Sequence, residues 1–441
     1  FFLILLGKFI QFLARTLNLG AGSTWPGHVA METNSKFVRQ VLKKNPNLKV
    51  VLIAGTNGKT TTSLMLQKIL EEDGLKVFRN ESGANLLNGI ASSIIVNANL
   101  TGRLNFDVAI FEVDERNLGP ALEEMSVVSG QLSVVLLNIF RDQLDRYGEV
   151  NQVLKDWKGT LSDVDSNTFL FTNGDDPALS FLTKSLKLKS YFFGIDEILM
   201  IKSSTGHDVD FIYCPNCQSK LNYKKVSFSH MGDFTCPNCS FERENIDLVK
   251  IDHYPLVGTY NIYNVNAAAL IANKGFNISV EKINSALINF RPAFGRQEEI
   301  NYKGRKVIVL LSKNPAGFNQ SIDSLVDLLH PRGGKDHTPQ GCIILLVLND
   351  RIPDGRDVSW IWDVDFENLP KNSKIFVAGD RAYDMALRIK YSEKAAQVFE
   401  NLGRAIENSI SETSTSETLF ILPTYSAMLE ARKILIGRKI L

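Results

Sequence analysis

Short apolar runs alternate with segments of helical periodicity along most of the chain. The first run, 49–54, ends at Gly55, and apolar residues then recur at helical spacing from Thr60 to Glu72. Three more apolar runs follow, separated by helix-like stretches, at 108–111, 133–139 and 168–172. Strands that alternate with helices are typical of a parallel sheet, so the pattern predicts an α/β central domain.

A second α/β unit is expected from about Arg296 to the end of the chain. Its apolar runs predict strands at 307–311, 342–348, 375–378 and 418–422. Two polar segments between these runs, 331–340 and 409–418, are expected to be loops.

The first residues of the chain have the spacing of an amphipathic helix. Apolar residues recur at Phe2, Leu5, Leu6, Phe9, Phe12 and Leu13. Polar interruptions make the segment too broken to span a membrane, and it lacks a convincing signal-peptide cleavage site. Two interpretations remain: a helix packed on the protein body, which we favour, and a helix in peripheral contact with a membrane surface.

Composition indicates a globular protein of about three domains, because the chain has 441 residues, 44% hydrophobic and 22% charged. With 49 basic and 48 acidic residues the net charge is +1, which gives no sign of a nucleic-acid partner. We expect an N-terminal helical segment at 1–45, a central domain at 46–294 and a C-terminal α/β domain at 295–441. An insertion at 205–245 is expected to interrupt the central domain.

A glycine-rich loop lies between the first predicted strand and its helix, with the sequence Gly55-Thr56-Asn57-Gly58-Lys59-Thr60-Thr61. Glycines let backbone N–H groups turn toward phosphate oxygens, and the helix N-terminus adds positive potential. Lys59 is expected to reach the β- and γ-phosphates of a nucleotide, and the Thr60 hydroxyl to bind Mg²⁺. The usual phosphate-loop motif requires glycine where this chain has Ile53, so this loop is a shorter variant.

Four of the five cysteines form a C-x₂-C-x₁₈-C-x₂-C pattern: Cys214, Cys217, Cys236 and Cys239. Two such pairs supply four thiolates, which predicts a closed, structural zinc site rather than a catalytic one. The fifth cysteine, Cys342, lies in an apolar run and is expected to be a buried core residue. Hydrolysis of glutamine to ammonia needs an activated cysteine or an N-terminal nucleophile with a base. The histidines form no evident set with Cys342, so if this protein uses ammonia from glutamine, another chain must produce it.

The loop resembles that of the Mur ligase superfamily, and further motifs match in chain order. They are the acidic strand 111–115, the segment 138–148, the turn 173–177, the helix start 258–264 and the segment 295–298. Gln143 and Tyr260 replace histidines that are usual in two of these motifs. The resemblance implies a Mur-ligase-like central domain with an inserted zinc ribbon, followed by a Rossmann-like α/β C-terminal domain.

The cysteine insertion and the segments 313–320 and 348–363 resemble the MurT family, the ATP-dependent subunits of lipid II isoglutaminyl synthase. This resemblance implies amidation of the D-glutamate α-carboxylate of the peptidoglycan stem peptide through an acyl phosphate. ATP and Mg²⁺ would be required, and a GatD-like glutamine amidotransferase would supply ammonia. Lipid II would be met at the inner face of the membrane by a cytoplasmic protein.

The resemblance also implies roles for individual residues. Glu112 would join Thr60 as a Mg²⁺ ligand, Asn138 and Asn264 would lie near the nucleotide, and Arg296 would stabilise the transferring phosphoryl group or form a domain-boundary ion pair. Asp357 would serve the partner's glutaminase site, with Asp350 and Asp354 as alternatives.

Lys158 is either a carbamylated lysine that bridges metal ions or a solvated helix residue. Two rival functions remain for the chain. One is a ligase that adds an amino acid or a glutamate tail, and the other is a non-catalytic, ATP-gated zinc scaffold.

Overall fold

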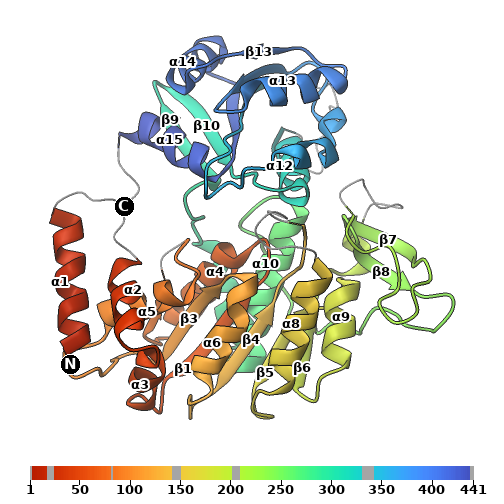
Figure 1. The fold of residues 1–441 in the computed structure, drawn as a ribbon. Coiled ribbons are helices and arrows are strands. Elements are labelled where there is room, and N and C mark those ends of the chain that lie inside the picture. The colour runs from red at the N-terminus through yellow and green to blue at the C-terminus, as the bar shows by residue number, and fades with distance from the viewer. Residues whose placement is uncertain are drawn as a thin grey trace.

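Two six-stranded sheets, one in each half of the chain, organise the computed structural model. The structure describes residues 2–16, 24–80, 83–141, 150–200, 209–329 and 342–437. Within these residues the first sheet and its helices form a lower body, and the second sheet forms an upper body above its edge (Figure 1). The arrangement confirms the predicted α/β class.

The first sheet is wholly parallel, with the strand order β2-β3-β1-β4-β5-β6. Its strands are β1 (Lys49–Ala54), β2 (Val77–Arg79), β3 (Val108–Val113), β4 (Leu132–Leu136), β5 (Phe169–Asn173) and β6 (Lys189–Phe193). Alternate residues of β1 enter two different cores, so Leu52 faces one helical layer and Ile53 the other. Burial on both faces explains why this strand reads as one continuous apolar run.

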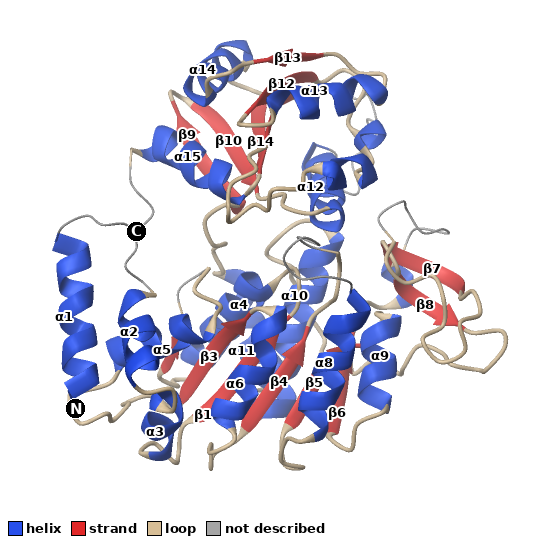
Figure 2. Ribbon diagram, in the orientation of Figure 1, coloured by secondary structure: helices blue, strands red, loops and turns tan. Residues whose placement is uncertain are grey.

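Helices cover both faces of this sheet, as Figure 2 shows. One layer consists of α5 (Leu87–Asn97), α6 (Leu118–Met125), α8 (Val150–Ser162) and α9 (Pro177–Lys184). The other layer consists of α4 (Lys59–Glu72), α10 (Thr259–Leu270) and α11 (Val280–Ile288). The phosphate-loop strand β1 is therefore fixed between two packed layers.

Three N-terminal helices pack beside α5: α1 (Phe2–Thr16), α2 (Trp25–Thr33) and α3 (Phe37–Lys43). Helix α2 crosses α5 closely because Gly27 has no side chain; a Cβ there would lie 1.9 Å from the Asn88 carbonyl oxygen. The expected N-terminal helix is confirmed, and it is packed on the body. Among the residues that the structure describes, no helix is long and apolar enough to cross a membrane.

The cysteine segment forms a small lobe at the side of the lower body, built on the hairpin β7 (Asn222–Phe228) and β8 (Met231–Thr235) (Figure 1). Its core combines cysteines with Leu221, Phe234 and Phe241. Phe241 packs edge-to-face on Phe181 of α9, which attaches the lobe to the sheet domain.

The second sheet has the order β13-β12-β11-β14-β10-β9 and is parallel except for β9. Its strands are β9 (Arg296–Tyr302), β10 (Arg305–Leu310), β11 (Ile343–Val347), β12 (Lys374–Ala378), β13 (Ala396–Val398) and β14 (Thr418–Pro423). Its helices are α12 (Pro315–Leu329), α13 (Ala382–Tyr391), α14 (Leu402–Glu412) and α15 (Tyr425–Ile436).

The prediction of a loop at 409–418 was wrong for residues 409–412. The segment 409–418 was expected to be a loop, but α14 continues to Glu412. Ser409 donates to the Ala405 carbonyl at 2.8 Å, and Ile406 and Ile410 are buried. Burial of this apolar face outweighs the weak helix propensity of serine. The segment 331–340 lies outside the described residues.

Candidate functional site

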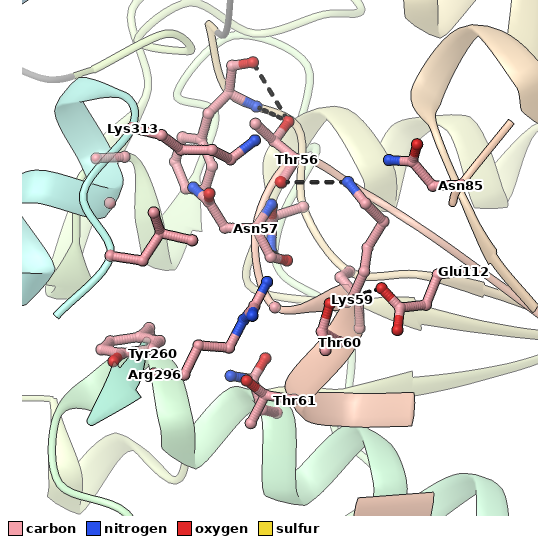
Figure 3. Close-up of a pocket in the computed structure, with 18 of the residues that line it drawn as sticks. Thr56, Asn57, Lys59, Thr60, Thr61, Asn85, Glu112, Tyr260, Arg296 and Lys313 are labelled. Carbon is pink, nitrogen blue, oxygen red and sulfur yellow. Dashed lines mark hydrogen bonds between the residues drawn. The ribbon is translucent and has the colours of Figure 1, made fainter. Parts of the chain in front are cut away.

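A cavity of about 360 Å³ lies between the lower and upper bodies. Its walls combine the loop after β1, the ends of β3 and β4, α10, and the first residues of the upper body (Figure 3). Most of the residues predicted from sequence line it: Thr56, Asn57, Gly58, Lys59, Thr60, Thr61, Glu112, Asn138, Asn264 and Arg296. Of the predicted loop, only Gly55 is absent from the lining.

The glycines of the loop are required by its backbone. Gly55 and Gly58 have φ angles of 142° and 89°, which side chains disfavour. A Cβ at Gly58 would also lie 2.2 Å from the Asn264 Oδ1 atom. Asn264 accepts a hydrogen bond from the Thr62 hydroxyl at 3.2 Å, so α10 and α4 meet directly beneath the loop.

Asn138 braces the loop from the neighbouring strand. Its Oδ1 accepts from the Asn57 backbone N–H at 2.8 Å, and its Nδ2 donates to the Asn57 carbonyl at 2.9 Å. Asn138 follows β4, and β4 pairs with β1 on the side opposite β3. The chain runs from β1 to β2 on one side of the sheet and from β4 to β5 on the other, so the connections diverge between β1 and β4, which is where open α/β sheets form ligand crevices.

The ammonium group of Lys59 lies within the loop that precedes it. Its Nζ donates to the Gly55 carbonyl and, at 3.3 Å, to the Thr56 carbonyl. Glu115 places a carboxylate oxygen 3.8 Å from the same Nζ. Burial opposes ionisation of Glu115, but the positive charges of Lys59 and Lys313 outweigh it, with help from hydrogen bonds, and its pKa is lowered. The cavity therefore holds a buried carboxylate between two cations.

Thr60 and Glu112 bring two oxygen ligands together. The Thr60 hydroxyl donates to Glu112 Oε2 at 2.6 Å, and the Ser63 hydroxyl donates to Oε1 at 2.9 Å. Arg79 lies 3.3 Å from Oε1. A hydroxyl beside a buried carboxylate is a donor set that suits Mg²⁺, which binds through oxygen and keeps several waters. These residues fit the ion that the sequence predicts.

The upper body contributes two cations to the cavity wall, Arg296 and Lys313, which Figure 3 shows facing the loop. Burial lowers the pKa of Arg296, while the negative charge of Glu112 opposes this shift. A guanidinium remains protonated despite such burial. The sequence left two roles open for Arg296, one at the transferring phosphoryl group and one in a domain-boundary ion pair. Its position in the cavity wall favours the first.

The ion pair of the segment 295–298 is formed by Glu298, and it lies within the upper body. Glu298 binds Arg432 through two contacts of 2.6 and 2.7 Å, and its Oε2 also accepts from the Gly295 N–H at 2.8 Å. The Gly-Arg-x-Glu segment therefore anchors the first turn of the upper body with Glu298. Arg296 is left free to point into the cavity.

The turn 173–177 connects the cysteine lobe to the cavity wall. Asp175 accepts from the Tyr263 hydroxyl at 2.6 Å and from Arg243 of the lobe at 2.7 Å. Its carboxyl is fully buried, and burial raises its pKa although Arg243 opposes the shift. Tyr263 lines the cavity, and so do Phe228 and Met231 from the lobe hairpin. The lobe is therefore part of the wall of the site.

The four cysteines converge as predicted. Their Sγ atoms all lie within 4.8 Å of one another, with Cys214 3.6 Å from Cys239 and Cys217 3.4 Å from Cys236. A tetrahedral zinc ion with Zn–S bonds of about 2.3 Å requires sulfur atoms roughly 3.8 Å apart. The geometry therefore fits zinc, and four protein ligands would leave no open coordination position.

The three candidate aspartates near residue 357 have different surroundings. Asp354 is buried and accepts from the Ser426 backbone N–H at 2.8 Å and from its hydroxyl, while Asp350 lies 3.3 Å from Arg381. Asp357 is exposed, and one of its oxygens accepts from the Ser359 N–H at 2.8 Å. Hydrogen bonding to Ser359 lowers its pKa, so Asp357 presents an ionised carboxylate to solvent.

Some predicted or possible site residues lie elsewhere. Lys158 is exposed on α8, with its Nζ 6.0 Å from the Phe181 ring centre, and it does not line the cavity. This favours the solvated interpretation. Gln143 and most of the segment 138–148 lie outside the described residues.

The sequence predicts no role for several other residues of the cavity wall, among them Glu115, Lys313, Asn85 and Tyr260. Glu115 and Lys313 lie inside segments that resemble the family, but only the fold brings them to the phosphate loop.

The fold and the cavity define the class of protein. The Mur ligase middle domain model matches residues 53–272. Among solved structures, a pseudomurein peptide ligase type C from Methanothermus fervidus is similar with a TM-score of 0.66, 21% identity, and coverage of 91% of this chain and 81% of that chain. The MurF ligase from Thermotoga maritima in complex with ADP is similar with a TM-score of 0.62, 16% identity, and coverage of 92% and 83%. The chain has the Mur ligase fold.

The family within this class follows from the upper body and from the curated relatives. The MurT ligase C-terminal model matches residues 311–428. The MurT subunit of lipid II isoglutaminyl synthase from Streptococcus pneumoniae is 30% identical over 447 residues, which cover 96% of this chain and 94% of that protein. The MurT subunit from Staphylococcus aureus strain COL is 29% identical, covering 84% and 83%. The chain belongs to the MurT family and is an ATP-dependent ligase of peptidoglycan biosynthesis.

Proposed function

We propose that this chain uses ATP to amidate the α-carboxylate of D-glutamate in the stem peptide of lipid II, giving D-isoglutamine. One observation carries the proposal: the phosphate loop faces Arg296 and Lys313 across a single cavity, in a chain that belongs to the MurT family. Such a cavity supplies cations on both sides of a transferring phosphoryl group.

ATP would bind with its phosphates in the loop from Gly55 to Thr61. Lys59 already donates to two loop carbonyls, and phosphate oxygens would replace them as stronger acceptors. Mg²⁺ held by Thr60 and Glu112 would neutralise charge on the β- and γ-phosphates. Glu115 would hold the Lys59 side chain in the loop, because one of its carboxylate oxygens lies 3.8 Å from Nζ.

The acceptor must be activated because a carboxylate has no good leaving group. A carboxylate oxygen would attack the γ-phosphorus while ADP leaves, forming an acyl phosphate. Ammonia would then attack the carbonyl carbon, phosphate would leave, and the nitrogen would lose a proton. Arg296 and Lys313 would stabilise negative charge in the first step, because they line the cavity on the wall opposite the loop.

Ammonia is proposed to come from a separate glutaminase chain. The free thiol outside the zinc cluster, Cys342, is only 2% exposed, and burial raises its pKa to about 11. A buried, protonated thiol is a poor nucleophile. Among the described residues this leaves no evident cysteine for glutamine hydrolysis.

The upper body offers a surface for that partner beside Asp357. Tyr383, Leu387 and Tyr391 follow one another at four-residue intervals on α13, with exposures of 67%, 48% and 67%. The Tyr391 ring lies 5.3 Å from the ring of Trp362, five residues after Asp357. Exposed aromatic patches are typical of protein interfaces. Docking there would bring Asp357 to a Cys–His glutaminase site, where a third group orients the histidine.

The test of the proposed function uses the purified chain, ATP, Mg²⁺, ammonium chloride and the lipid-linked stem peptide. We expect ADP and a stem-peptide amide in equal amounts, with no product when the acceptor is omitted. Free amino acids offered instead of ammonia should give no product. Amino-acid addition would establish the rival ligase, and absence of acceptor-dependent ATP turnover with a glutaminase partner present would establish the scaffold.

The partner's role is tested with Asp357→Asn. In the complex this variant should lose glutamine-dependent amidation and keep amidation with free ammonia, because the ATP site is separate. Glu407→Gln is a matched control, since it removes a partly exposed carboxylate of the upper body on α14, away from the proposed docking surface. Normal glutamine hydrolysis by the Asp357→Asn complex would exclude Asp357 from this role.

A further inference from the structure

The outward face of helix α1 is apolar along its described length. The exposed residues follow helical spacing of three and four, which puts them on one side. They are Phe2, Leu5, Phe9, Phe12 and Leu13, with exposures of 68%, 46%, 56%, 64% and 38%. Soluble proteins seldom leave a contiguous strip of large apolar side chains open to water, so this face is expected to have a partner.

The opposite face of α1 is committed to the protein body. Ile4 and Ala14 are buried, and a Cβ at Gly7 would lie 2.9 Å from Ile95 of α5 and 3.4 Å from Pro26 of α2. Such close contact fixes the helix along the edge of the lower body, where Figure 1 shows it beside α2. The helix therefore cannot turn its apolar strip inward without giving up this packing.

The same pair of helices reaches the candidate active site. Helix α2 begins at Trp25, which is 60% exposed, and the preceding residue, Thr24, lines the cavity. An exposed tryptophan suits the boundary between water and lipid, because its ring is apolar and its N–H is polar. Lys8 lies on the flank of the strip and donates to the Val96 carbonyl at 2.9 Å.

A second copy of the chain is a weaker candidate for this face. With about 200 Å² per large side chain, the exposed fractions of these five residues and Trp25 amount to roughly 660 Å² per chain. A symmetric pair would then bury at most about 1,300 Å², near the lower limit of the roughly 1,200–2,000 Å² of stable interfaces. A lipid surface has no such threshold, because each apolar side chain that leaves water adds to binding.

We propose that the outward face of α1, together with Trp25, docks the enzyme on the surface of a lipid bilayer. This inference rests on the proposed function, because a lipid-linked acceptor has to be presented to the cavity from a membrane. The helix would lie in the interface plane with its strip among the acyl chains. Its inner face would stay packed on α2 and α5. The cavity, which Thr24 lines, would therefore be held near the lipid surface.

Vesicle flotation tests the docking directly, with vesicles of equal phosphatidylglycerol and phosphatidylcholine. The full chain should float with the vesicles, and Phe9→Glu and Phe12→Glu should each bind at least about tenfold more weakly, because a carboxylate is costly to place among acyl chains. Ile288→Glu is the matched control, since Ile288 is 65% exposed on α11 and should tolerate the change. Phe12→Ser provides a milder variant, and circular dichroism checks the fold of each.

Two acceptors separate this inference from the proposed function. The Phe9→Glu variant should lose amidation of the lipid-linked acceptor in vesicles and keep amidation of a lipid-free stem peptide in solution. Wild-type chain that binds vesicles but amidates neither acceptor would refute the proposed function and leave the docking intact. Equal vesicle binding by Phe9→Glu and wild type would overturn the docking. A wild-type dimer that Phe9→Glu dissociates in sedimentation velocity would overturn it in favour of a second copy.

Discussion

The side-chain amides of Asn57 and Asn314 exchange hydrogen bonds of 3.3 and 3.2 Å between the lower and upper bodies. Asn57 lies in the phosphate loop, and Asn314 lies just before α12 of the upper body. Lys313, the neighbour of Asn314, also lines the cavity. This amide pair therefore helps to fix the position of Lys313 relative to the phosphate loop.

Asn314→Ala should weaken this coupling without unfolding either sheet. One neutral hydrogen-bonded pair is worth about 1 kcal/mol, so the expected loss in kcat/KM for ATP is roughly fivefold to tenfold. Steady-state kinetics with ammonia as the nitrogen source measures it. Asn408→Ala is a suitable control because, within the described part of the chain, the Asn408 side chain bonds to the Arg404 carbonyl of its own helix. Unchanged kinetics in Asn314→Ala would mean that the pair does not position Lys313.

Lys59→Ala should abolish ATP-dependent amidation and leave the fold intact. Removing a positioned charge from a phosphoryl site costs about 3 kcal/mol or more, which is a rate loss of at least about a hundredfold. Lys68→Ala, on the exposed side of the same helix, should retain normal activity. Near-normal turnover in Lys59→Ala would remove the loop from the mechanism.

Glu112→Gln should raise the Mg²⁺ concentration needed for half-maximal activity. The substitution keeps the shape of the side chain but removes the negative charge that attracts the ion. Saturating Mg²⁺ should recover part of the rate, whereas Glu71→Gln on the exposed end of α4 should behave like wild type. An unchanged Mg²⁺ dependence would show that Glu112 serves only its contacts with Thr60, Ser63 and Arg79.

The purified chain should contain about one zinc ion, and Cys236→Ser should lose it. Because zinc binding energy is folding energy for such a lobe, the lobe should be destabilised by an amount on the order of several kcal/mol. Elemental analysis and limited proteolysis of the lobe give the two readouts. Cys342→Ser is the control, because Cys342 lies in the upper-body core. Protein prepared without chelators that contains no zinc would contradict the assignment.

The local parts of the site could be predicted from sequence, and the long-range parts could not. The loop from Gly55 to Thr61 connects a strand to the helix that follows it, so the roles of its glycines and its lysine can be predicted from seven consecutive residues. Glu115 reaches Lys59 only because β3 pairs with β1, and Asn314 is 257 residues from Asn57. No periodicity in the sequence reports such contacts.

The same distinction explains the outcome for the elements of the fold. The strands at 49–54 and 108–113 are buried on both faces and read as apolar runs. The edge strand β9 is mostly polar and antiparallel to β10, so its pattern gave no comparable signal. The end of α14 was missed because its serines suggested a loop, whereas tertiary packing of Ile406 and Ile410 decided the structure.

Transfer of isotopic oxygen from acceptor to phosphate tests whether the reaction passes through an acyl phosphate. The α-carboxylate of the stem-peptide acceptor would be enriched in heavy oxygen, and the purified chain would be given ATP, Mg²⁺ and ammonia. If the carboxylate attacks the γ-phosphorus, its oxygen remains bonded to that phosphorus when ammonia displaces phosphate. We expect the inorganic phosphate released with each amide to carry a labelled oxygen from the acceptor. Amide formation accompanied by unlabelled phosphate would contradict it.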